Sequence, residues 1–238
     1  MGVKLALRWV DRAPESKDHP RAVINVLRKA LESLEGRNFS KWKVTCTVLK
    51  PKAEGGAKDF FLVQFSDHPT RQYLILRQER QALEADSSAK DLLEKLGAFM
   101  SPFVHLFEGS CFMVGDFVVK LGRAHTSTNE YRGIVAEVEY RPLTRTDIAK
   151  PVMDEFTAIL QQAIATQQAE TLSKNERVEQ CLGRLEVVHV PLDEYDLPPR
   201  FGFLHSAVQY VSLCSASPAA QAGKHIRALS AAPASAQG

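Results

Sequence analysis

Hydrophobic and polar residues alternate with a period of two over several short segments of the chain. Large apolar side chains occupy every second position in residues 3–9, and again in residues 42–48. This period is that of a β-strand. Further strands are predicted, between turn-forming residues, at 59–65, 72–77, 103–107, 110–121, 133–141 and 185–190.

Helical periodicity, with apolar residues every three or four positions, occurs in four other places. These are residues 20–34, 89–96, 152–163 and 204–211. Gly36 and Gly97 follow the first two and are expected to end them. Residues 166–179 are polar and have no usable period, so no element is predicted there.

The order of these elements indicates the fold class. Strands come in hairpin-like runs and do not alternate regularly with helices, which favours an α+β fold with a mainly antiparallel sheet. Residues 59–65 are apolar on both faces of the predicted strand. A sheet that curls on itself and is covered by helices accounts for this, so we expect a closed or nearly closed β-barrel with flanking helices. One domain is predicted over residues 1–214, and the Ala/Ser/Pro-rich residues 215–238 are expected to be a disordered tail.

Charge excludes some functions and leaves others open. The formal net charge is only +2, whereas a dedicated nucleic-acid binder is usually strongly basic. Residues 1–50 nevertheless carry 11 Lys and Arg against 5 Asp and Glu, while residues 151–200 carry 4 against 9. Two interpretations stay open. Either exposed faces of opposite sign are local in the sequence, or the chain has a steering surface for a charged partner.

The cysteines and the apolar runs bear on metal binding and location. Cys46, Cys111, Cys181 and Cys214 form no C-x-x-C pair, which excludes the usual zinc-ribbon spacing and favours reduced, structural cysteines. No apolar run reaches the length of a membrane helix, and the N-terminus has no signal-peptide pattern. We therefore expect a soluble protein of the cytosol or nucleus.

No motif of a nucleotide-binding loop or a zinc protease is present in the sequence. His105 lies in an apolar strand, where a core histidine is expected.

Glu137 and Glu139 share one face of a strand that ends in Arg141. Such strands line the triphosphate tunnel metalloenzymes, so the alternative function is a metal-dependent triphosphate hydrolase using these two carboxylates. The pattern lacks companion basic strands. Simple alternation, with residues 134, 136 and 138 facing the core, is therefore preferred, and no catalytic, cofactor-binding or metal-binding residue is predicted.

A nucleic-acid-binding barrel is a third hypothesis, based on Lys41, Lys43, Lys50 and Lys52. Trp42 is the one aromatic residue in that strand, and it falls on the opposite face from Lys41 and Lys43. Stacking of bases needs an aromatic ring on the basic face, so we expect no direct nucleic-acid site.

Two neighbouring runs resemble a known family. They are EGSCFMVGDFVVKLG at residues 108–122 and RGIVAEVEY at residues 132–140. Together they resemble the subunit 20 family of the Mediator complex, the coactivator that bridges transcription factors and RNA polymerase II. The likeness covers roughly residues 1–165 and 200–214, so residues 166–200 are interpreted as a variable insertion.

The resemblance implies a fold, partners and a location. It implies a β-barrel with flanking helices that pairs with subunit 18 and docks on a helix of subunit 8, within the nuclear head module. It also implies no catalytic activity and no cofactor. We further expect exposed apolar surface at which the partner binds. The sequence does not assign the residues that contact these partners.

Overall fold

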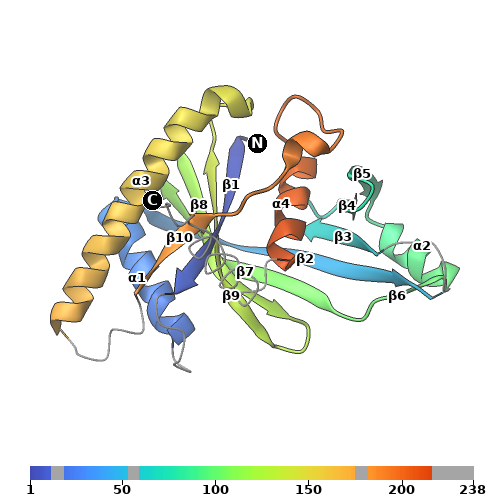
Figure 1. Cartoon of the computed structure of the whole chain (residues 1–238), viewed down its shortest axis with the longest axis horizontal. Helices are drawn as coiled ribbons and strands as arrows, with labels where there is room; N and C mark the ends of the chain where they lie inside the picture. The colour runs from blue at the N-terminus through green and yellow to red at the C-terminus, as the bar shows by residue number, and fades with distance from the viewer. Residues whose placement is uncertain (12–18, 53–58, 175–181, 216–238) are drawn as a thin grey trace, which may run out of the picture.

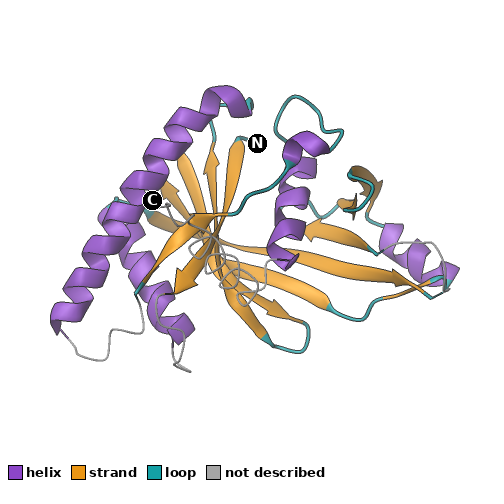
Figure 2. Ribbon diagram, in the orientation of Figure 1, coloured by secondary structure: helices purple, strands orange, loops and turns teal. Residues whose placement is uncertain are grey.

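The computed structural model describes residues 1–11, 19–52, 59–174 and 182–215. Most of the strands form one large sheet with helices on both of its faces (Figures 1 and 2). The strands are β1 (Val3–Asp11), β2 (Arg37–Pro51), β3 (Phe60–Phe65), β4 (Arg71–Leu76), β5 (Gln81–Asp86), β6 (Phe99–Met100), β7 (Val104–Val114), β8 (Phe117–Thr126), β9 (Tyr131–Tyr140) and β10 (Gly183–Val187). The helices are α1 (His19–Ser33), α2 (Ala89–Leu96), α3 (Thr146–Lys174) and α4 (Phe203–Ser215), with a short 3₁₀ turn η2 (Leu192–Glu194).

The predicted α+β class and mainly antiparallel sheet are confirmed. The strand order is β10-β1-β9-β8-β7-β2-β3-β4-β5, with β6 attached to β2, and each of these pairings is antiparallel. Neighbouring strands along the chain mostly pair as hairpins, which is why the helices do not separate the strands regularly.

The predicted closed or nearly closed barrel is confirmed only in part, because the sheet is not closed. β10 and β5 are two separate edges of the sheet, and the described strands form no hydrogen-bonded pair that joins them. α4 gives the physical reason, because it contacts β1, β2, β3, β4 and β5. The sheet curves around this helix, which lies between the strands near β1 and those near β3 in Figure 1. Because a helix fills the concave face, the two edges stay apart.

The two faces of the sheet carry separate cores. On one face α1 and α3 pack against each other and against β1, β8 and β9, around residues such as Leu7, Leu27 and Phe156. On the other face α4 packs over β2 and β3, around residues such as Phe65 and Tyr210. β3 is apolar throughout because Phe61, Val63 and Phe65 face the α4 core, while Phe60 and Leu62 pack on the opposite face with Leu93 of α2 and Phe99 of β6.

The segment around Gly115 is a hairpin. The sequence pattern suggests one strand with a bend over residues 110–121, but β7 ends at Val114 and β8 begins at Phe117. Gly115 has a φ of +55°, and Val114 pairs with Phe117 across the two-residue loop. A glycine at the first central position is typical of such a tight hairpin. The sequence pattern does not predict β5 or β6, since Leu83 is the one large apolar residue of β5 and β6 has only two residues.

α3 is longer than predicted. It continues through residues 166–174, for which the sequence pattern predicts no element. The side-chain amides of Gln161 and Gln168 donate hydrogen bonds to the backbone carbonyls of Leu185 and Gly183 on β10. Polar side chains therefore attach this half of the helix to the sheet edge, which an apolar period cannot reveal. That residues 166–200 vary within the family stays a proposal.

The predicted disordered tail, apart from Ser215, lies outside the described residues. The single domain over residues 1–214 likewise stays a proposal. Within the described part of the chain, no helix is both long enough and apolar enough to cross a membrane.

Candidate functional site

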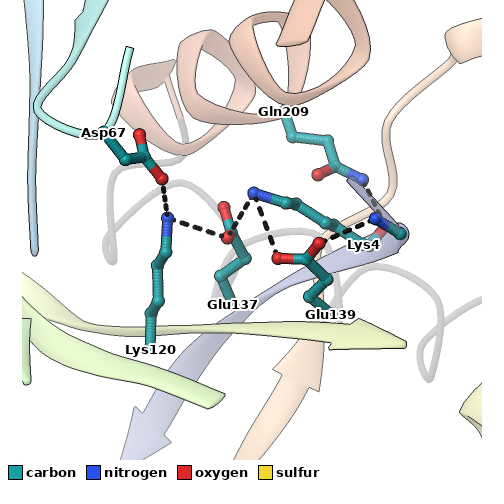
Figure 3. Close-up of polar contacts among 7 residues, drawn as sticks. Lys4, Asp67, Lys120, Glu137, Glu139 and Gln209 are labelled. Atoms are coloured by element: carbon teal, nitrogen blue, oxygen red, sulfur yellow. Dashed lines mark hydrogen bonds and ion pairs between the residues drawn. The ribbon is translucent and has the colours of Figure 1, made fainter. Parts of the chain in front are cut away.

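A buried cluster of charges lies between the sheet and α4. Glu137 on β9 is only 3% exposed, Lys4 on β1 is 2% exposed and Lys120 on β8 is 5% exposed. These three residues come from adjacent strands, because β9 pairs with both β1 and β8. Their side chains project from the sheet face that α4 covers, as Figure 3 shows.

Glu137 lies at the centre of this cluster. Its Oε1 atom is 2.9 Å from the Lys4 ammonium nitrogen and 3.3 Å from that of Lys120. Lys4 is also 3.6 Å from Glu139, and Lys120 is 3.1 Å from Asp67 (Figure 3). Two buried ammonium groups therefore share one fully buried carboxylate and reach two more that are partly exposed.

α4 covers the charge cluster on the side away from the sheet. The side-chain amide of Gln209 donates a hydrogen bond of 2.9 Å to the Lys4 carbonyl oxygen, and the Arg8 guanidinium donates one of 2.5 Å to the Leu213 carbonyl. The Lys4 ammonium lies 5.9 Å from the ring centre of Phe203, and the Lys120 ammonium lies the same distance from Trp42. α4 is thus attached to β1 by two polar contacts, one at Lys4 and one at Arg8.

The pKa values show which effect dominates inside the cluster. Burial alone raises the pKa of Glu137, but the Lys4 and Lys120 ammonium groups outweigh it and lower the pKa to about 2. For Lys120, burial alone lowers the pKa, whereas the Glu137 and Asp67 carboxylates reverse this and raise it. Glu137 and Lys120 are therefore both charged at neutral pH.

This arrangement differs from the sequence-based expectation for Glu137 and Glu139. The expected absence of companion basic strands is wrong, because Lys4 and Lys120 lie on the two strands that flank β9. A divalent cation would have to displace two ammonium groups from Glu137, and the described residues hold no group of three or more His, Cys, Asp or Glu that could bind a metal ion. The cluster is suited to holding β1, β8, β9 and α4 together.

A sequence signal for the two missed lysines does exist. Lys4 lies between Val3 and Leu5, and Lys120 lies between Val119 and Leu121, so each interrupts a strongly apolar strand. A charge at such a position needs a partner inside the protein, since buried charges are paired. Which carboxylate it meets depends on strand register, and a single strand does not contain that information.

The other candidates from the sequence lie apart from this cluster. Lys41, Lys43 and Lys52 are exposed, and Lys50 pairs with Asp59 at 3.7 Å. Trp42 lies on the opposite face from Lys41 and Lys43, as predicted, and is buried there against α4. His105 is only 9% exposed, and burial lowers its pKa, which fits a core histidine. Cys46 and Cys111 are buried and Cys214 is partly buried, all as free thiols, while Cys181 lies outside the described residues.

A second feature of functional interest is an exposed apolar surface at the β5 end of the sheet. It consists of Leu83 on β5, Leu92 and Leu96 on α2, and Met100 on β6, and we call it the α2 surface. These side chains are 48–63% exposed. They lie on elements next to a small core of Leu49, Phe60 and Leu62. Leu93 of α2 and Phe99 of β6 pack against that core, and Leu83 of β5 pairs with Leu74, which also packs against it. Apolar surface gathered in one place marks an interaction site more often than isolated residues do.

Comparisons with known proteins identify relatives of this chain. The family model described as "TATA-binding related factor (TRF) of subunit 20 of Mediator complex" matches residues 1–214. "Mediator of RNA polymerase II transcription subunit 20b" from Arabidopsis thaliana is 30% identical over 172 residues, which are 69% of this chain and 78% of the plant protein.

Solved structures give more distant likenesses. PH1012 protein from Pyrococcus horikoshii OT3 matches with a TM-score of 0.39 and 13% identity, over 67% of this chain and 90% of that one. A chain in the structure of the Schizosaccharomyces pombe Mediator head module matches with a TM-score of 0.35 and 15% identity, over 76% and 96% respectively. Neither likeness is close enough to assign a function.

Proposed function

Because this chain belongs to the subunit 20 family of the Mediator complex, we propose that it works in the nuclear head module of Mediator, where it pairs with subunit 18 and docks on subunit 8. It supports transcription by RNA polymerase II through protein–protein contacts. The α2 surface is the observation that carries the pairing, and we assign subunit 18 to it.

Membership of the family makes the chain a component of a transcription coactivator rather than an enzyme. The alternative of a triphosphate hydrolase using Glu137 and Glu139 is therefore wrong. The geometry agrees with this, since the Glu137 carboxylate is occupied by two lysines.

The case for the α2 surface begins with the helix itself. α2 has only eight residues and buries none of them, while Leu92 is 61% exposed and Leu96 is 63% exposed. Isolated helices this short are unstable in water, and in proteins packing of an apolar face supplies most helix stability. Only Leu93 of its leucines packs against the small core beneath. A partner that covered Leu92 and Leu96 would supply the missing packing.

The neighbouring strand supports the same assignment. β5 is an edge of the sheet, and Leu83 on it is 53% exposed. An edge strand beside apolar side chains offers a partner both backbone hydrogen bonds and apolar contact. A stable pair of proteins buries at least about 1,000 Å² of surface, counted over both partners. The surface that spans β5, α2 and β6 would be this chain's share of that area.

Co-expression with subunit 18 tests the pairing. A partner that binds only the folded chain stabilises it by about 2.7 kcal/mol when present at a hundredfold excess over Kd. We therefore expect the melting temperature to rise by about 5–10 °C on adding subunit 18. The pairing is wrong if the chain alone is monodisperse at high concentration and gains nothing in yield or melting temperature from subunit 18.

A further inference from the structure

A hollow of about 550 Å³ lies on the sheet face opposite α4, where α1 meets β2, β7 and β8. Four cationic residues line it: Arg28 from α1, Lys41 and Lys43 from β2, and Arg123 from β8. Glu108 on β7 is the one carboxylate residue among the residues that line it. We call this feature the basic hollow. It is separate from the α2 surface and from the buried charge cluster.

Strand register brings these charges together. Lys43 on β2 is directly opposite Glu108 on β7, and Glu108 is directly opposite Arg123 on β8. In the adjacent row of the same face, Lys41 is opposite Ser110. Residues opposite each other on antiparallel strands have Cβ atoms about 4.5–5.5 Å apart, so the three cations of the sheet share a small area.

Among the residues that the structure describes, most of this positive charge has no ion-pair partner. The Lys43 and Arg123 side chains form no ion pair with the described residues, and Lys41 donates only to the Ser110 hydroxyl at 3.1 Å. Arg28 pairs with Glu32 at 3.8 Å, and Glu108 pairs with His125 at 3.3 Å. Exposed cations held close together repel one another, and an anionic ligand removes that repulsion.

From this charge pattern we propose that the basic hollow is a docking site for an acidic protein segment, in which carboxylates flank an apolar side chain. The inference deepens the proposed function and rests on it, because it adds a second class of protein partner to a subunit that works by protein contacts. Ile24 is half-buried beside Arg28, one helical turn away on α1, and gives the hollow an apolar wall. The carboxylates would bind the four cations, and the apolar side chain would contact Ile24.

The lining favours a protein over a nucleic acid. Bases are bound by stacking on exposed aromatic rings, but the two aromatic residues that line the hollow, Trp42 and Phe112, are only 5% and 2% exposed. Glu108 lies between Lys43 and Arg123 in the same row of side chains. Its carboxylate would repel a continuous line of phosphates. Separately spaced carboxylates can avoid Glu108, whereas a phosphate backbone passing from β2 to β8 cannot.

Fluorescence anisotropy with the full chain tests the inference. The probe is a fluorescein-labelled peptide of alternating Glu and Leu, and the control peptide has Gln in place of Glu. Binding of the Glu peptide should exceed that of the Gln peptide and weaken with added salt, since exposed charges are screened. Lys41→Glu combined with Lys43→Glu should weaken binding of the Glu peptide by about tenfold or more, because two attractive charges become repulsive.

Matched controls separate this inference from the proposed pairing. Arg145→Glu combined with Lys150→Glu makes the same change in net charge on exposed positions of another surface and should leave peptide binding unchanged. The Lys41/Lys43 variant should still pair with subunit 18. Equal peptide binding by the two variants overturns the inference, and so does tighter binding of a single-stranded oligonucleotide that displaces the peptide. If the unmodified chain binds the peptide but does not pair with subunit 18, the result counts against the proposed function alone.

Discussion

Replacing Glu137 with Gln is expected to lower the free energy of unfolding by about 3–5 kcal/mol, the usual cost of removing one partner from a buried ion pair. Glutamine keeps the size of the side chain but removes its charge. The Lys4 and Lys120 ammonium groups, both nearly inaccessible to water, then lose their shared carboxylate. For a chain of this length, such a loss lowers the melting temperature by about 10 °C. Thermal denaturation followed by circular dichroism measures it.

The same carboxylate makes stability depend on pH. In the folded chain the pKa of Glu137 is about 2, against an ordinary value of 4.5. The unfolded chain therefore takes up this proton first as the pH falls. Glu137 stabilises the fold fully above about pH 5, and this contribution, about 3 kcal/mol, is lost between about pH 5 and pH 2. The Glu137→Gln variant should show a correspondingly smaller loss of stability over that range.

Two comparison variants test this explanation. Glu130→Gln removes an exposed carboxylate that pairs with Arg132, and it should change the unfolding free energy by less than about 1 kcal/mol. Replacing all three buried charges, with Glu137→Leu, Lys4→Met and Lys120→Met, should restore much of the stability that Glu137→Gln loses, because apolar groups need no partner. A Glu137→Gln variant that melts within 2 °C of the unmodified chain contradicts the buried-pair account.

Leu92→Glu combined with Leu96→Glu should weaken pairing with subunit 18 by at least about a hundredfold. Both side chains are exposed on α2 in the isolated chain and would be covered in the pair. Burying a carboxylate without a partner costs several kcal/mol, and each 1.4 kcal/mol is a factor of ten in Kd. The isolated chain should keep its melting temperature within about 2 °C, since neither leucine is buried. Analytical ultracentrifugation of the two subunits together measures the effect.

α3 supplies the control for this pair of substitutions. Ile148 and Ile159 are 51% and 44% exposed, so Ile148→Glu combined with Ile159→Glu makes the same chemical change on a different surface. Pairing should be retained in that variant. If the α3 variant loses pairing while the α2 variant keeps it, the α2 surface is not the site of subunit 18.

The fold was predictable as far as local patterns determine it. The alternation around Trp42 and the helical stripe ending at Gly36 identify β2 and α1 correctly, because side-chain direction follows directly from backbone period. Closure of the sheet depends on where α4 docks, which is a contact between distant parts of the chain. The second half of α3 was missed for a related reason. Gln161 and Gln168 bind the backbone of β10, and such hydrogen bonds leave no apolar period.

The candidate sites were likewise predictable only where a single strand or helix determines them. Glu137 and Glu139 are visible in the sequence as a pair on one strand face, but their lysines come from two other strands, 133 and 17 residues from Glu137. The α2 surface was expected only as exposed apolar area without residues. In the sequence, the leucines of α2 look like those of an ordinary amphipathic helix. The structure shows that only Leu93 packs against the core beneath, so that Leu92 and Leu96 stay exposed.

Affinity purification of the tagged full-length chain from nuclear extract, followed by mass spectrometry, tests the central claim most directly. A Mediator subunit that works by protein contacts should bring down the other Mediator subunits in near-stoichiometric amounts, with subunits 18 and 8 among those retained longest as salt is raised. Recovery of the chain alone, or with proteins that exclude Mediator subunits, would contradict the account.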